Sequence, residues 1–225
     1  MRRRPGPSAA RRWWARPSSA LVLLLALAAA FAACGRGSAQ PDPYRLRRPS
    51  EFVLRPAEVP GLPPSDAAAV SNDDAASSSP DPRAARADFR KWRRLDGYRV
   101  TFSDDGPAPN GWLLVESDIA LFQEPGGAHD AFVAGVRDLR RAGMPGAPAQ
   151  WTELPSPKLG DEAVARQTSG RAADGTTTTA VAVVWRRGRG LALVAISATE
   201  GRITLDQVVE LAQRVDRRME GSDRG

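Results

Sequence analysis

Two long apolar segments near the C-terminal end constrain the fold of this chain most. Residues 176–185 and 191–199 are rich in β-branched and aliphatic side chains, and the sequence RGRG at 187–190 joins them. This arrangement predicts a β-hairpin with glycine at the turn positions that need positive φ. The second segment is apolar on both faces from Leu191 to Ile196. We expect that strand at the centre of a sheet, because strands buried on both faces show such continuous apolar runs.

Shorter patterns complete the predicted fold. Alternating side chains predict further strands at 98–103, 112–122, 151–154 and 162–167. Apolar spacing and capping signals predict three helices, which begin at Asp81-Pro82, near Ala128 and at Thr204. Strands joined by hairpins, with helices between them, predict an α+β fold: an antiparallel or mixed β-sheet covered on one side by about three helices.

The first 33 residues have the organisation of a bacterial export signal. An arginine-rich head precedes an unbroken apolar run of 14 residues, Ala20 to Ala33. As a helix this run would span about 21 Å, which is less than the ~30 Å hydrocarbon core of a bilayer. A basic head and a short apolar run therefore predict a signal peptide, because a permanent anchor needs a longer span.

The net positive charge of the chain is confined to this leader. The first 33 residues hold no acid and six arginines: Arg2, Arg3, Arg4, Arg11, Arg12 and Arg16. The whole chain has 32 basic and 26 acidic residues, so without these six the two kinds balance. The basic character therefore reflects targeting, and we expect no nucleic-acid partner for the neutral remainder.

The apolar run ends on the only cysteine of the chain. The sequence Phe31-Ala32-Ala33-Cys34 resembles the lipobox of bacterial lipoproteins, in which a large apolar residue and two small ones precede a cysteine. The resemblance implies cleavage before Cys34, a diacylglyceryl thioether on its sulfur and acylation of the new amino group. Two or more acyl chains anchor a protein stably in a bilayer. A plain secretory leader of the Ala-x-Ala type and an uncleaved anchor are the alternatives.

Composition divides the chain into three parts. We expect a lipoprotein signal peptide at 1–33, a lipid-anchored flexible tether at 34–50 and an α+β domain at 51–221. Within the domain, residues 51–80 are expected to be loosely ordered. The sequence of residues 51–62 predicts either a short edge strand or a packed loop, because prolines interrupt its run of apolar residues. Residues 65–80 are low in complexity and predict a mobile segment.

Part of the globular region resembles small extracellular domains of actinobacterial lipoproteins and the sensor region of mycobacterial receptor kinases. Three features carry the likeness: the helix 128–142 after a strand, the sequence LGDEA at 159–163, and the hairpin 183–194 that leads into the final helix. The likeness covers about Trp112 to Met219. The kinase sensors carry disulfides, which a chain with one cysteine cannot form internally. The resemblance implies a ligand-sensing or envelope-associated module and not an enzyme.

No set of residues indicates catalysis or metal binding. His129, the only histidine, lies near Glu124 and Asp130 and is a candidate general base or metal ligand. One histidine without a free thiol makes a poor metal site. Nucleophilic catalysis needs a nucleophile, a base and an orienting group together. We therefore predict no catalytic residues, no metal and no cofactor, and we do not expect an enzyme.

Other polar and aromatic side chains have alternative interpretations. Arg186, Arg187 and Arg189 at the predicted turn either bind an anionic headgroup or wall polymer or form a solvated turn. Asp161 and Glu162 are adjacent, and on a strand they would point to opposite faces. Four tryptophans either line a ligand cavity or fill the core, which is the default for aromatic side chains: Trp92, Trp112, Trp151 and Trp185.

These observations predict an extracytoplasmic lipoprotein with a binding or sensing role. Its expected partners are the lipid bilayer, through acyl chains on Cys34, and an unknown small ligand or envelope protein. One alternative is an envelope hydrolase with an unrecognised site, which requires a polar cleft with convergent catalytic groups. Another is a structural accessory subunit, which requires an exposed apolar patch of several hundred Å².

Overall fold

The computed structural model describes residues 47–139, 151–171 and 175–221. The predicted signal peptide, the cleavage motif Phe31-Ala32-Ala33 and the lipid-attachment residue Cys34 lie outside the described residues. The prediction of a tether likewise falls almost entirely on residues that precede Arg47. Within the described ranges, no helix combines the length and the apolar character needed to cross a bilayer.

A seven-stranded antiparallel sheet forms the centre of the domain. The strands lie in the order β1-β2-β3-β7-β6-β5-β4. Their bounds are β1 Pro64–Ala69, β2 Arg94–Ser103, β3 Trp112–Phe122, β4 Thr152–Leu154, β5 Glu162–Arg171, β6 Thr177–Arg187 and β7 Gly190–Thr199. Strand β7 is the middle strand of the seven, so the central position expected from its apolar run is confirmed. The predicted α+β class, with helices packed on an antiparallel sheet, is confirmed as well.

Strands β6 and β7 form the predicted hairpin with a tight turn. Arg187 pairs with Gly190, which leaves only two residues at the turn. Gly188 has a φ of 56°, a backbone conformation that glycine adopts without a steric penalty. Gly190 is the first residue of β7 and has no positive φ. The glycine prediction therefore holds for Gly188 alone.

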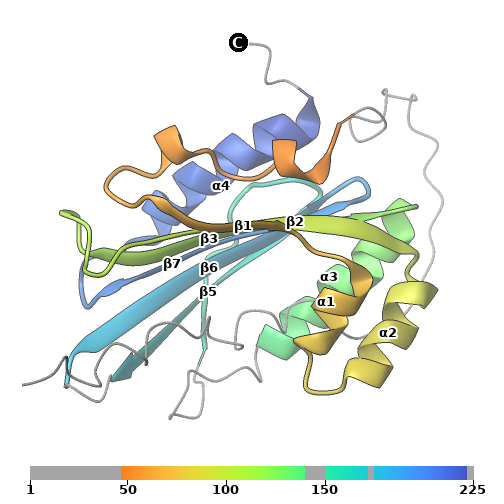
Figure 1. Ribbon diagram of the computed structural model, residues 1–225, viewed down its shortest axis with the longest axis horizontal. Coiled ribbons are helices and arrows are strands. Elements are labelled where there is room, and N and C mark those ends of the chain that lie inside the picture. The colour runs from red at the N-terminus through yellow and green to blue at the C-terminus, as the bar shows by residue number, and fades with distance from the viewer. Residues whose placement is uncertain (1–46, 140–150, 172–174, 222–225) are drawn as a thin grey trace, which may run out of the picture.

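Helices cover both faces of the sheet (Figure 1). Their bounds are α1 Asn72–Ser77, α2 Pro82–Lys91, α3 Pro125–Leu139 and α4 Leu205–Glu220. Helix α4 packs on one face together with residues 52–62, while α1, α2 and α3 lie on the other face. The prediction that helices cover only one side is therefore wrong. The physical reason is that β3, β6 and β7 bury apolar side chains on both faces, so each face needs a cover.

Helix α4 forms as its sequence predicts. The Thr204 hydroxyl accepts from the Gln207 backbone N–H, and the Gln207 side chain accepts from the Thr204 N–H, which is the predicted capping box. Gly221 ends the helix in the left-handed conformation with a φ of 78°. The apolar stripe of the helix is buried against the sheet at Val208, Ala212, Val215 and Met219. Burial of this stripe provides the stability that a 16-residue helix lacks on its own.

Residues 51–62 form a packed loop and not an edge strand. The loop contains two single turns of 3₁₀ helix, η3 Pro49–Glu51 and η4 Pro56–Glu58. The Leu54 N–H donates to the Ser117 hydroxyl of β3 over 3.2 Å. The five large aliphatic and aromatic side chains of the loop are at most 5% exposed: Phe52, Val53, Leu54, Val59 and Leu62. This loop therefore belongs to the core beside α4.

Residues 65–80 also have regular structure, in contrast to the predicted mobile low-complexity segment. They contain all of β1 except its first residue, Pro64, and the whole of α1. Ser71 caps α1 by accepting the Asp74 N–H, and Asp74 accepts the Ser71 N–H in return. Ala75 and Ala76 are then buried. These two small residues of α1 pack into the core cluster that also includes Ala85 and Phe89 of α2.

Candidate ligand-binding site

Three charged side chains gather on the helix α1 side of the sheet. Arg99 of β2 lies opposite Asp118 of β3 in the register, and Glu116 lies two residues before Asp118. The Arg99 guanidinium donates to Asp118 Oδ2 from Nε at 2.9 Å and from Nη2 at 2.6 Å. Glu116 Oε1 lies 3.1 Å from Arg99 Nε. We call these three residues the Arg99 cluster.

The strand alternation places this cluster on one face. Ile119 and Val115 of β3 point into the core beneath α4, so Glu116 and Asp118 point to the opposite face, as the sequence pattern predicts. The side chain of Arg99 is 20% exposed and those of both acids are 11% exposed. Charges that are this buried are stable only when they are paired. Burial of this cluster in the sheet therefore costs folding free energy, which its ion pairs offset.

The cluster is not fully satisfied. Glu116 Oε1 is buried and takes part in no hydrogen bond, although it makes an ion-pair contact with Arg99. Burial raises the pKa of Glu116 to about 7, and Asp118 adds to this while Arg99 opposes it. Burial also opposes the charged form of Arg99, but the attraction of Asp118 and Glu116 outweighs it and leaves that pKa raised. Glu116 therefore changes its charge near neutral pH.

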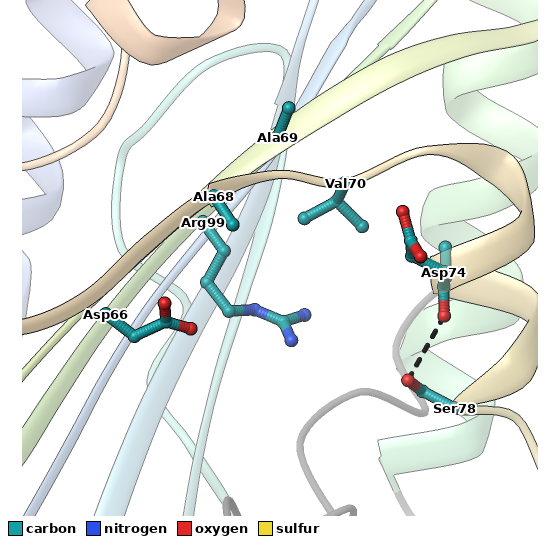
Figure 2. A pocket seen from close by; sticks show the side chains of 8 residues that line it. Asp66, Ala68, Ala69, Val70, Asp74, Ser78 and Arg99 are labelled. Atoms are coloured by element: carbon teal, nitrogen blue, oxygen red, sulfur yellow. Dashed lines mark hydrogen bonds between the residues drawn. The ribbon is translucent and has the colours of Figure 1, made fainter.

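A cavity of about 280 Å³ lies next to the cluster, between β1 and α1. Figure 2 shows the Arg99 side chain extending from β2 into this cavity, with Asp66 of β1 on one side and Asp74 of α1 on the other. The Ser78 hydroxyl faces the cavity and donates to the Asp74 carbonyl oxygen at 3.2 Å. The remaining lining residues are small or apolar: Ala68, Ala69, Val70 and Ala75.

The electrostatics of the cavity favour a cationic ligand. Of the residues that the structure describes, Arg99 is the one cation in the lining, and it is already engaged by Asp118 and Glu116. Asp66 and Asp74 line the cavity as well. Asp74 stays ionised readily, because hydrogen bonds from the Ser71 hydroxyl and N–H lower its pKa. Among the described lining residues, two acids thus accompany one arginine.

His129 does not join the acids that flank it in the sequence. Its Nδ1 lies 2.7 Å from Glu162 Oε1 at the start of β5, whereas Glu124 pairs with Arg93 at 2.7 Å. Glu162 in turn accepts from Arg186 Nε. Among the residues that the structure describes, no group of three or more His, Cys, Asp or Glu side chains is arranged to hold a metal ion.

The arginines at the hairpin turn bind to the protein itself. Arg186 Nη1 lies 2.7 Å from Asp161 Oδ2, and Arg187 Nη2 lies 2.6 Å from Asp216 Oδ2 of α4. Arg189 Nη1 donates to the Phe122 carbonyl oxygen at 3.0 Å. In the structure these side chains are thus neither free to bind an anionic headgroup nor part of a freely solvated turn. They fasten the hairpin to its neighbours.

Asp161 and Glu162 converge on one partner, which corrects the prediction that they point to opposite faces. Both carboxylates contact Arg186 of β6. The alternation rule does not apply here, because Asp161 precedes β5 and follows Gly160, which has a φ of 52°. The pair therefore serves to fix the β5–β6 corner.

The tryptophans agree with the core interpretation. Trp92, Trp112 and Trp185 are at most 5% exposed, and Trp151 packs against the core beside α3 with part of its surface exposed. The lining of the cavity between β1 and α1 contains no tryptophan. Sequence reasoning missed the Arg99 cluster itself. The available signal was the pair of acids, Glu116 and Asp118, inside an otherwise apolar strand.

Comparison with known proteins informs the fold. No protein-family model matches the chain, and no curated protein sequence matches it. Among solved structures, the extracellular domain of PknH from Mycobacterium tuberculosis is similar, with a TM-score of 0.53 and 11% sequence identity. The match covers 76% of this chain and 94% of that domain. Such a likeness shows a shared fold alone, and at that level it agrees with the resemblance to kinase sensor domains inferred from the sequence.

Proposed function

We propose that this protein is a non-enzymatic binding or sensing module, held on the extracytoplasmic side of the cell envelope by lipid on Cys34. The lipobox-like leader and the charge balance of the remaining chain support this location. The likeness to an extracellular domain supports it further. The observation that carries the binding role is the cavity between β1 and α1, whose lining includes Arg99 of the Arg99 cluster.

The chemistry of the cavity suits binding more than catalysis. Its one hydroxyl, that of Ser78, donates to a backbone carbonyl and not to a base. The paired guanidinium of Arg99 and the carboxylates of Asp66 and Asp74 provide a charge pattern that selects a ligand without reacting with it.

The accessory-subunit alternative gains no support from the surface. Only two large apolar side chains are exposed in the described part of the chain, Leu95 and Val133, each at 43%. They come from different elements, β2 and α3. Single exposed apolar residues of this kind are normal on monomeric proteins.

The anchor is tested by the intact mass of the membrane-extracted protein beside that of Cys34→Ser. We expect the wild type to begin at Cys34 and to carry the mass of two or three acyl chains. The variant should keep its leader and carry no lipid. A variant that is trimmed and membrane-bound like the wild type would contradict the anchor.

The binding role is tested by thermal unfolding in the presence of compound panels, namely polyamines, sugars, wall fragments and short peptides. A ligand at 100 times its Kd stabilises the folded state by about 2.7 kcal/mol. Ala68→Trp fills the cavity from an exposed position on β1, and Ala67→Trp is the matched control because Ala67 is exposed on the same strand without lining the cavity. We expect one class to raise the Tm of the wild type and of the control but not of Ala68→Trp. Equal responses in all three proteins, or none in the wild type, would contradict the role.

A further inference from the structure

Strand β1 is an open edge of the sheet. It pairs with β2 on one side, and no described strand pairs with its other side. All six of its residues are exposed. Val70, just beyond it, exchanges two backbone hydrogen bonds with Gly97, at 2.9 and 3.1 Å. Hydrogen-bonded pairs alternate along an antiparallel ladder, so Ala67 and Ala69 direct their N–H and C=O groups outward.

This edge has little of the protection that edge strands usually have. Natural edges are shielded by lysines, prolines, bulges or a covering element. Pro64 and the register shift between Pro64 and Asp66 disturb pairing only at the first end of β1. The stretch from Ala67 to Ala69 carries small side chains that leave the backbone open to another strand.

The charge of this edge selects the kind of strand that can join it. Residues 64–80 contain no lysine or arginine, and of their three acids Asp73 pairs with Arg86 of α2 at 2.8 Å, which leaves Asp66 and Asp74 beside the edge. A second copy of the chain would bring this acidic edge against itself, which is unfavourable. A basic strand is complementary to it. The edge therefore favours a positively charged partner over self-association.

The cavity beside the edge accommodates one side chain. Its volume of about 280 Å³ lies at the small end of the roughly 300–1,000 Å³ of ligand sites, which is room enough for one long side chain. Asp66 and Asp74 stand on its two sides, and Arg99 is neutralised by its own acids (Figure 2). A lysine or arginine side chain of an added strand would meet two carboxylates there.

We propose that β1 captures an extended basic peptide segment, which adds as a further strand and places one lysine or arginine in the cavity between Asp66 and Asp74. This inference rests on the proposed binding function and names its partner class. In such strand addition, backbone hydrogen bonds provide affinity and pockets for alternate side chains provide specificity. The partner strand forms hydrogen bonds with the outward N–H and C=O groups of Ala67 and Ala69. The carboxylates of Asp66 and Asp74 in the cavity bind its basic side chain.

The test uses the full mature chain in detergent micelles and a positional library of eight-residue peptides. In each sub-library one position is fixed as Lys, Arg, Glu or Ala and the others are randomised. We expect Lys or Arg to be retained about tenfold more than Glu at one position, the ratio that 1.4 kcal/mol of discrimination gives. Equal retention of Lys and Glu at every position would overturn the proposal.

Two variants separate the backbone and charge contributions. Ala67→Pro removes an outward N–H, and proline is tolerated at an edge strand. We expect it to reduce retention of the selected peptide at least tenfold, while Glu210→Ala, an exposed change on α4 away from this edge, keeps it. Asp66→Lys should reverse the preference from Lys to Glu. Circular dichroism and the Tm establish that each variant is folded, and Asp66→Asn provides a second charge variant if Asp66→Lys is not.

Other outcomes point to other answers. A chain that dimerises, and becomes monomeric in Ala67→Pro, would show that β1 pairs with a second copy and would overturn the proposal. Full binding by Ala67→Pro would show that no strand is added and would overturn it too. If another compound class stabilises the wild type but not Ala68→Trp while no basic peptide is selected, the binding function stands and this inference fails.

Discussion

The carboxylate of Asp216 accepts the indole N–H of Trp185, with Oδ1 3.0 Å from Nε1. The same carboxylate accepts from Arg187 Nε at 2.8 Å and from Arg187 Nη2 at 2.6 Å, and from the Gly160 N–H at 3.3 Å. One side chain of α4 thus fastens the helix to β6 and to the loop before β5. The hydrogen bond that Arg187 donates to Asp216 raises the pKa of Arg187.

We expect Asp216→Ala to destabilise the fold by about 3 kcal/mol, because it leaves the Trp185 indole and the Arg187 guanidinium without their shared acceptor. Urea unfolding measures the change. The control is Glu210→Ala on the same helix, whose carboxylate pairs with Arg214 at 2.7 Å and is 66% exposed. That variant should change stability by less than about 0.5 kcal/mol. Similar losses in both variants would show that Asp216 is only another surface acid.

Glu116 should make stability depend on pH. Its pKa is about 7 in the folded protein against 4.5 as the ordinary value, so the folded state holds its proton more tightly than the unfolded chain. The stabilisation is fully present below pH 4.5 and is lost as the pH rises toward 7. The free energy of unfolding of Glu116→Gln relative to wild type should rise by about 3 kcal/mol between pH 4 and pH 8. If the free energies of unfolding of the two proteins change with pH in parallel, the raised pKa of Glu116 is contradicted.

Adjacent glycines at the start of α3 should respond in opposite directions to the same substitution. A Cβ on Gly127 would overlap the Trp92 carbonyl oxygen, whereas a Cβ on Gly126 would meet no heavy atom within 4 Å. We expect Gly127→Ala to cost at least about 2 kcal/mol, because the helix must move away from Trp92. Gly126→Ala should lose nothing and gain up to about 1 kcal/mol from helix propensity. Thermal unfolding of the two variants compares them directly, and equal Tm values would refute the close approach.

Replacing Arg218 alone should lower the free energy of unfolding more than replacing Arg218 and also removing the charge of its partner Glu58. Its guanidinium is 2% exposed and donates to Glu58 Oε1 at 2.8 Å, to Glu58 Oε2 at 3.0 Å and to the Val53 carbonyl at 3.0 Å. We expect Arg218→Met to cost about 3–5 kcal/mol, because it leaves a largely buried carboxylate unpaired. The double variant with Glu58→Gln should lose less than the single variant. Chemical denaturation of both proteins measures the difference, and a larger loss in the double variant would contradict this account.

The amino-acid sequence alone determined the elements whose signals are local. The β6–β7 hairpin, the burial of β7 and the capping box of Thr204 follow from periodicity and from residues a few positions apart. These features depend on backbone sterics and short-range hydrogen bonds, so a pattern in the chain is enough to predict them.

Only the tertiary structure decided what brings distant residues together. It placed helices on both faces of the sheet, turned residues 65–80 into β1 and α1, and closed the ion pair between Arg218 and Glu58, which are 160 residues apart in the chain. It also assembled the Arg99 cluster and the cavity at the β1 edge. The physical reason is that strand order and charge pairing depend on which surfaces become neighbours when the core closes, and no local pattern encodes that choice.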